Sequence, residues 1–306
     1  MDYSVLISLM IKVALLIISG YILKKTGILT ETVEQGISGM ILKFILPCSV
    51  LASAGNGFGK GMASGLLIMG ASALLYYLAA IGLTGLLGRI FKLGEEKRRI
   101  FITLTVFANT AFLGYPISQE LYGNEGFVYA VVYNMFYQLF FFTYGIGLIR
   151  GSREKSLRSV LVTPANLALL AMICLAAFHI TLPDVLQDTL SSVGNMMVPL
   201  SMLVIGCSLV GMRPIEMLKD RQCYLVSAFR LLVYPLLALF LLRLFRVSEP
   251  IASLSVILAG LPSGSLNVIV AKQYHCEGDF AARSVVQTMV LGVVTIPFII
   301  WLCTVI

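Results

Sequence analysis

The sequence has 306 residues, of which 58% are hydrophobic and 12% are charged, and its mean hydropathy is +0.94. Soluble domains carry about twice this fraction of charged residues, so the composition excludes an ordinary soluble protein and predicts an all-α integral membrane protein with many spans. The net charge of +7 does not indicate nucleic-acid binding, because the basic residues cluster between apolar runs, as they do in cytoplasmic loops.

Ten apolar runs are separated by charged residues or by proline and glycine, and each is long enough to be a transmembrane helix. The expected spans are 4–23, 34–54, 62–88, 100–121, 126–149, 164–180, 187–211, 222–245, 250–272 and 281–304. Sixteen lysines and arginines lie in or beside the odd-numbered loops, and three lie in the even-numbered loops. We therefore expect a cell membrane protein with the odd-numbered loops in the cytoplasm and both termini outside.

A basic linker, 150–163, divides the ten spans into an N-terminal repeat, 1–149, and a C-terminal repeat, 164–306. Each repeat contains an odd number of spans, so the two repeats must have opposite orientations. Short matches between the halves, separated by about half the chain, support this division. The predicted fold is therefore ten transmembrane helices arranged as two inverted five-helix repeats.

Proline and glycine interrupt two of the expected spans near their centres, at Asn109–Pro116 in span four and Gly260–Asn267 in span nine. Proline has no N–H to donate and disfavours helix in the residue before it. We expect the fourth helix to stop near Asn109 and restart at Pro116, and a second half-helix to begin near Pro262. Corresponding interruptions in the two halves of an inverted repeat indicate the binding site of a transporter.

Spans four and nine run in opposite directions, so the half-helices after the breaks should direct their N-termini towards the midplane from opposite sides. Helix N-termini carry partial positive charge and unpaired N–H groups, which favour an anion. The residues expected to contact substrate are polar or small residues at the breaks, basic residues inside spans, and amides of spans five and ten: Asn109, Thr110, Gly114, Pro116, Pro262, Ser263, Ser265, Asn267, Arg230, Lys43, Asn134 and Gln287.

Each of these groups also has a purely structural interpretation. The polar residues at the breaks could simply satisfy loosened backbone. Lys43 and Arg230 could pair with backbone carbonyls at kinks before Pro47 and Pro235, and Asn134 and Gln287 could form hydrogen bonds between helices.

No metal or cofactor is expected. Every aspartate and glutamate lies outside the expected spans or at their edges, which argues against proton relay through a buried carboxylate. Unwound carbonyls are able to bind sodium without a carboxylate, so coupling to sodium or protons stays open. The adjacent His275 and Cys276 lack further ligands at useful spacing, and the six cysteines show no pairing pattern.

The chain resembles the auxin efflux carrier family in its prokaryotic branch, which is distantly similar to bile acid sodium symporters. The resemblance rests on the first break, on Leu261-Pro262 followed by Ala271 and Tyr274, and on Arg230-Leu231 ahead of Pro235. It implies that spans four and nine cross at the substrate, with Asn109, Pro116, Pro262 and Ser263 beside it. It also implies an elevator motion against a scaffold of spans one, two, six and seven, often in a homodimer.

These observations predict a secondary transporter of small organic anions, such as mono- or dicarboxylates, with the lipid bilayer as its surroundings. The alternative is a passive anion channel or uniporter. An enzyme is not expected, because the spans contain no nucleophile with a base, no set of metal ligands and no paired carboxylates.

Overall fold

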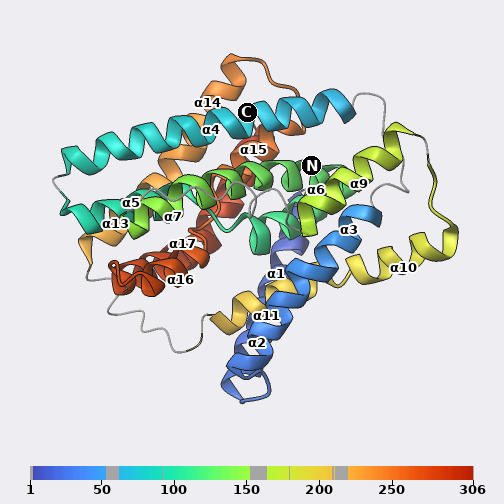
Figure 1. The fold of residues 1–306 in the computed structure, drawn as a ribbon, viewed down its shortest axis with the longest axis horizontal. Helices are drawn as coiled ribbons and strands as arrows, with labels where there is room; N and C mark the ends of the chain where they lie inside the picture. Colours follow the sequence, from blue (N-terminus) through green and yellow to red (C-terminus); the bar gives the residue numbers. More distant parts are fainter. Residues whose placement is uncertain are drawn as a thin grey trace. The chain divides into compact units, whose positions relative to one another are not determined.

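The computed structural model describes residues 3–52, 62–91, 93–151, 164–178, 180–208, 210 and 220–305. Its regular elements in these ranges are all helices (Figure 1). Six helical stretches are long and apolar enough to cross a membrane: Glu31–Ala52, Ser64–Gly88, Thr110–Arg150, Asp184–Cys207, Arg221–Leu244 and Gly278–Thr304. The all-helical class and the repeated membrane spans are thus confirmed, whereas the arrangement as ten inverted-repeat helices stays a prediction.

Two compact units make up the chain, and each takes segments from both halves of the sequence. Unit 1 comprises Met1–Gly65, Tyr115–Val131 and Leu161–Gly211. Its helices are α1 (Tyr3–Lys25), α2 (Glu31–Met40), η1 (Ile41–Ile45), α3 (Leu46–Ala52), the start of α6 (Tyr115–Phe140), α9 (Pro164–Ala177), α10 (Asp184–Gly194) and α11 (Met197–Ser208). Helix α11 packs along α1 (Figure 1), and a Cβ atom at Gly206 would lie 2.0 Å from the carbonyl oxygen of Ile17.

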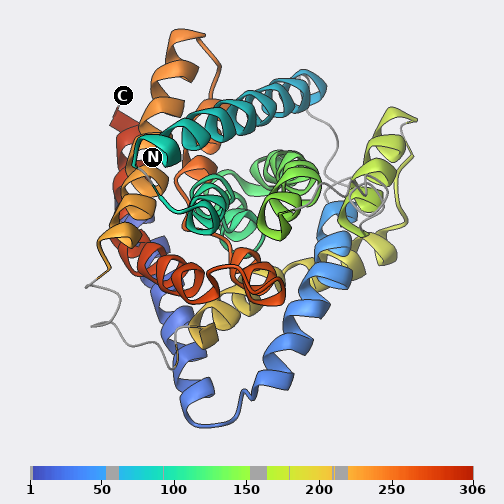
Figure 2. The ribbon, with the colours of Figure 1, turned by 60° about the vertical axis from the view of Figure 1, so that its left-hand side comes forward.

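Unit 2 comprises Leu66–Gly114, Val132–Val160 and Met212–Ile306. Its helices are most of α4 (Met62–Ile90), α5 (Glu95–Val106), η3 (Thr110–Gly114), the end of α6, η4 (Phe141–Gly145), α7 (Ile146–Arg150), α13 (Arg221–Ala228), η5 (Phe229–Val233), α14 (Tyr234–Leu244), α15 (Ile251–Ala259), α16 (Leu266–Gln273) and α17 (Gly278–Val305). Figure 2 shows α17, in red, beside α13 and α15, with which it packs. Most of the expected linker, 152–163, lies outside the described residues, and the repeat boundary stays a prediction.

Three π-helical segments, η1, η3 and η5, share one sequence feature: the second residue after each is a proline, Pro47, Pro116 or Pro235. Proline has no N–H to bond the carbonyl four residues earlier, and its ring clashes with that carbonyl. Widening the turn to i→i+5 bonding relieves both problems locally, and such turns are frequent at functional sites. Lys43, Thr110, Gly114 and Arg230 therefore lie in widened turns rather than in regular α-helix.

An aromatic core in unit 2 surrounds Phe107, the residue that follows the end of α5. The ring of Phe107 is fully buried, with centroid distances of 5.9 Å to Tyr77, 5.7 Å to Tyr137 and 5.1 Å to Phe141. Such ring pairs contribute beyond the apolar area that they bury. The core therefore fixes the chain at the point where the helix is interrupted.

Candidate functional site

The first interruption is short and extended. Helix α5 ends at Val106, Phe107 is extended (φ −101°, ψ 104°), and π-helical structure begins at Thr110. Regular α-helix restarts at Tyr115, one residue before the expected restart at Pro116, and a π-helical turn, Thr110–Gly114, precedes it. A bend at Gly123 (φ 62°, ψ −151°) falls between the fourth and fifth expected spans.

The second interruption lies between Ala259, where α15 ends, and Leu266, where α16 begins. The sequence predicted that this half-helix begins near Pro262, but it begins at Leu266. The reason is that residues 262–264 pair with the first break instead of forming helical bonds.

An isolated antiparallel bridge between Ala108 and Ser263 joins the two interruptions. The amide of Asn109 donates to the carbonyl of Pro262 (2.8 Å), and the amide of Gly264 donates to that of Phe107 (3.0 Å). A Cβ atom on Gly264 would lie 3.0 Å from the carbonyl oxygen of Ala108, so glycine permits this close approach. Four helix ends meet at the bridge, because α5 and α15 stop just before it and η3 and α16 start just after it.

Side chains of the second break bind backbone at the first break. The hydroxyl of Ser263 donates to the carbonyl of Leu104 (2.7 Å), and its amide donates to the hydroxyl oxygen of Thr288 on α17 (3.1 Å). Asn267 donates to the carbonyls of Phe107 (3.1 Å) and Gly264 (2.9 Å) through Nδ2. Ser263, Asn267 and Thr288 are fully buried, so these bonds satisfy groups that water cannot reach.

Within the first break, Asn109 and Thr110 have local partners. The Oδ1 atom of Asn109 accepts from the amide of Phe112 (3.3 Å), which caps the new helix. The hydroxyl of Thr110 donates to Oδ1 of Asn134 (2.5 Å), so Asn134 ties α6 to the break. Gly114 lies against Leu258 of α15 and Leu261 of the second break.

Arg230 is also fully buried in unit 2, and its guanidinium joins the ends of two helices. It donates to four backbone carbonyls and one phenol: Thr105 (3.1 Å), Val106 (3.0 Å), Leu258 (3.4 Å), Leu261 (2.7 Å) and the hydroxyl of Tyr76 (2.7 Å). Pairing with carbonyls, one of the two sequence interpretations, is therefore present. The carbonyls belong to the two breaks and not to the kink before Pro235.

Eight side-chain polar atoms in unit 2 are buried without a partner among the described residues, on Tyr77, Tyr133, Gln138, Gln222, Asn267, Arg283, Gln287 and Thr295. Buried polar atoms are rarely left unpaired, and a ligand or water is a usual explanation. Two of these atoms belong to residues that the sequence predicted for the site: Oδ1 of Asn267, an acceptor, and Nε2 of Gln287, a donor. The other side-chain atom of Gln287, Oε1, accepts from the hydroxyl of Ser227 at 3.3 Å.

Of the remaining predicted site residues, two lie outside unit 2. Lys43 and Pro116 belong to unit 1, where Lys43 is exposed and Pro116 is buried. Ser265 is half-buried just before α16, where its carbonyl accepts from the amides of Val268 and Ile269. Ten of the predicted residues thus share unit 2, and their contact with substrate stays a prediction.

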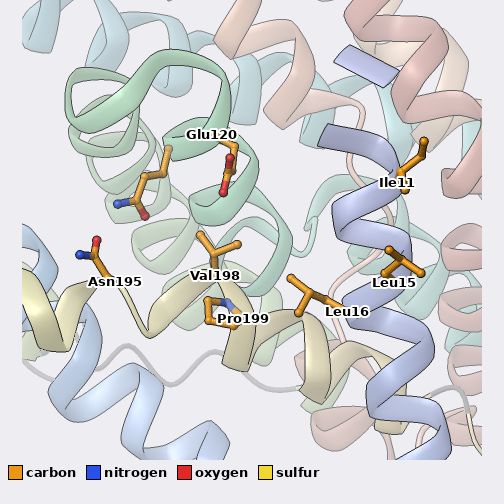
Figure 3. Close-up of a pocket in the computed structure, with 8 residues that line it drawn as sticks. Ile11, Leu15, Leu16, Glu120, Asn195, Val198 and Pro199 are labelled. Atoms are coloured by element: carbon orange, nitrogen blue, oxygen red, sulfur yellow. The ribbon is translucent and has the colours of Figure 1, made fainter. Parts of the chain in front are cut away.

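Unit 1 contains a cavity of about 850 Å³ that the sequence did not predict (Figure 3). Its walls come from α1, from α6 and from the α10–α11 region: Ile11, Leu15, Leu16, Gln119, Glu120, Asn195, Val198 and Pro199. Glu120 points from α6 towards Val198 and Pro199 (Figure 3). The one available sequence signal was the position of Gln119 and Glu120, one helical turn after Pro116 on the same helix.

Among the described residues, no group of three or more His, Cys, Asp or Glu could hold a metal ion. Near the surface of unit 2, Arg283 lies 3.2 Å from Asp220, which also caps α13 by accepting from the amide of Gln222 (3.0 Å). Burial raises the pKa of Asp220, but these two bonds outweigh it, so that the pKa is lowered overall.

Comparison with known proteins identifies the family of the chain. The sequence profile of the membrane transport protein family matches residues 5–160 and 152–300. An uncharacterized transporter of Methanocaldococcus jannaschii is 25% identical over 300 residues, which are 95% of this chain and 96% of that protein. An uncharacterized transporter of Methanothermobacter thermautotrophicus is 26% identical over 294 residues, which are 94% of this chain and 95% of that protein. The chain therefore belongs to the membrane transport protein family, in agreement with its resemblance to the auxin efflux carriers.

Proposed function

We propose that this membrane transport protein is a secondary transporter of small organic anions, with its substrate site at the joined breaks of unit 2. The observation that carries the proposal is the bridge between Ala108 and Ser263, at which two helix N-termini begin within three residues of the paired positions. Such N-termini present free N–H groups and partial positive charge to an anion.

The antiparallel direction of the bridge supports the wider arrangement that the sequence predicts. Two broken helices that pass each other in opposite directions are expected from inverted repeats. We therefore include in the proposal ten spans in two inverted repeats, alternating access by an elevator motion, and a cell membrane location with both termini outside. Unwound backbone at membrane depth is tolerated where protein or a cavity satisfies it, as the contacts of Ser263 and Asn267 do.

Counterflow in proteoliposomes tests the proposal. Purified protein would be reconstituted with a panel of mono- and dicarboxylates, with and without a sodium or proton gradient. We expect saturable uptake of at least one acid that is accelerated by the same acid on the opposite side. A passive anion channel would show flux without saturation or counterflow, and the absence of any saturable flux in folded protein would refute the proposal.

A further inference from the structure

Helix α14 has an apolar face that the described parts of the chain leave open. Leu236, Phe240 and Leu244 lie four residues apart, so they share one face of the helix, and they are 43%, 65% and 63% exposed. The helical stretch that contains them, Arg221–Leu244, is long and apolar enough to cross a membrane. We therefore expect this face to contact lipid chains and the end of α14 to lie near one surface of the bilayer.

Two exposed arginines lie at that end. Arg243 follows Phe240 by three residues on the same side of α14, and Arg246 lies just beyond the helix. The carboxylate of Glu249 lies 3.4 Å from Arg243, whereas no carboxylate among the described residues forms an ion pair with Arg246. The two arginines are also among the three basic residues of the even-numbered loops, so the preference of basic residues for cytoplasmic loops does not explain them.

Arg246 also has an unfavourable backbone conformation, with φ at 52° in the left-handed region. Its amide donates to the carbonyl of Arg243 (3.0 Å), and the amide of Val247 donates to that of Leu242 (3.0 Å), which is the Schellman arrangement at a helix end. Glycine is the usual residue at this position, because it adopts left-handed backbone without a steric cost. Arg243, in the last turn, already supplies a cation for the negative end of the helix dipole. An arginine kept at a strained position therefore indicates that its side chain has a partner.

We propose that Arg243 and Arg246 bind the phosphate of an anionic phospholipid whose chains lie along the apolar face of α14. Guanidinium groups form paired hydrogen bonds with phosphate oxygens, and the end of a membrane span is where the bilayer presents its phosphates. A soluble anion would match the charge but not the adjoining apolar face. The bound phosphate fixes the end of α14 at the level of the lipid headgroups. This inference does not depend on the proposed substrate site.

Quenching of tryptophan fluorescence by brominated lipids measures which lipid lies next to a chosen position. The sequence contains one tryptophan, Trp301, and Phe245 is 70% exposed beside the two arginines, so Trp301→Phe with Phe245→Trp gives a single reporter at the site. The full chain is reconstituted in mixtures of phosphatidylcholine and phosphatidylglycerol in which one lipid or the other is brominated. We expect phosphatidylglycerol to be preferred about fivefold at position 245, the effect of one basic residue near the membrane surface.

Val294→Trp in the same Trp301→Phe background is the matched control reporter. Val294 is 72% exposed on α17, and the residues within one turn of it on that helix are uncharged, so neither lipid should be preferred there. With the reporter at position 245, Arg246→Gly should abolish most of the preference, and it should fold because glycine accepts the left-handed conformation. Arg246→Lys should keep the preference, because it keeps the charge.

The inference is overturned if the preference for phosphatidylglycerol persists in Arg246→Gly or is equal at positions 245 and 294. Absence of quenching by either lipid at position 245 would also overturn it, because the end of α14 would then lie against protein. Loss of the preference on adding inorganic phosphate at constant ionic strength would mean that the arginines bind a free anion instead of a lipid. If Arg246→Gly does not fold, a folded Arg246→Lys protein without the preference would contradict the charge argument.

Discussion

The bond from the amide of Ser263 to the hydroxyl of Thr288 allows a sharp test of how the second break is held. Both residues are fully buried, and the two atoms are 3.1 Å apart. Thr288→Val keeps the shape of the side chain and removes the hydroxyl, so the Ser263 amide loses its acceptor. Leaving a buried donor unpaired costs about 1–3 kcal/mol.

This cost corresponds to a thermal shift that can be measured. For a chain of this size, about 1 kcal/mol lowers the melting temperature by roughly 2 °C, so Thr288→Val should melt roughly 2–6 °C below the unaltered protein. Thr304→Val is the matched control, because Thr304 lies on the same helix α17, is exposed, and donates to the carbonyl of Trp301 (2.7 Å). The control should shift by less than about 1 °C, as an exposed substitution usually does.

The comparison is made by thermal unfolding of both purified variants in the same detergent. If neither Thr288→Val nor Thr304→Val lowers the melting temperature by more than about 1 °C, the Ser263 amide has another partner, and the Thr288 hydroxyl does not hold the second break. If both variants shift equally and strongly, the loss would be a general effect of removing hydroxyls from α17, and the bond to Ser263 would not be its cause.

Three further predictions concern the breaks and the surface of unit 2. Asn109→Ala should lower anion flux in proteoliposomes while the protein remains folded, and Asn109→Asp should keep the helix cap; unchanged flux in the Ala variant would remove Asn109 from the site. Gly264→Ala should lower the melting temperature, because its Cβ would lie 3.0 Å from the carbonyl oxygen of Ala108 and such overpacking costs about 1–3 kcal/mol; an unchanged melt would show that the bridge has room. The lowered pKa of Asp220 means that its contact with Arg283 stabilises the fold above the unfolded pKa of about 3.9 and is lost as the pH falls below it. Asp220→Asn should therefore melt lower than the unaltered protein at pH 6, and the difference should shrink at pH 3.

The general character of the fold could be predicted because it depends on local chemistry. Long apolar runs must be helices in a bilayer, and the positions of the two interruptions follow from proline and glycine. The start of the second half-helix could not be predicted in this way. Residues 262–264 pair with the first break, which is distant in sequence, so the helix begins only at Leu266.

The sites were predicted unevenly for a similar reason. The residue types at the breaks indicated that Asn109, Ser263 and Asn267 form polar contacts. The side chains of all three form hydrogen bonds at the joined interruptions. The partners of Arg230 are carbonyls from two other helices, which no spacing along the chain reveals. The cavity beside Glu120 is likewise assembled from three separate segments. Lys43 is exposed, and its expected contact with substrate stays a prediction.

The bond between Ser263 and Leu104 joins positions 159 residues apart, and this separation has a consequence for biogenesis. Synthesis at about 5–20 residues per second leaves an interval on the order of ten seconds or more between the emergence of the two partners. During that time the nascent N-terminal half contains the first break, but the second break, which pairs with it, has not yet been synthesised. Until then, the unpaired carbonyls of the first break must form hydrogen bonds with water, lipid headgroups or the insertion machinery. The contacts between the two breaks are therefore among the last to form during folding.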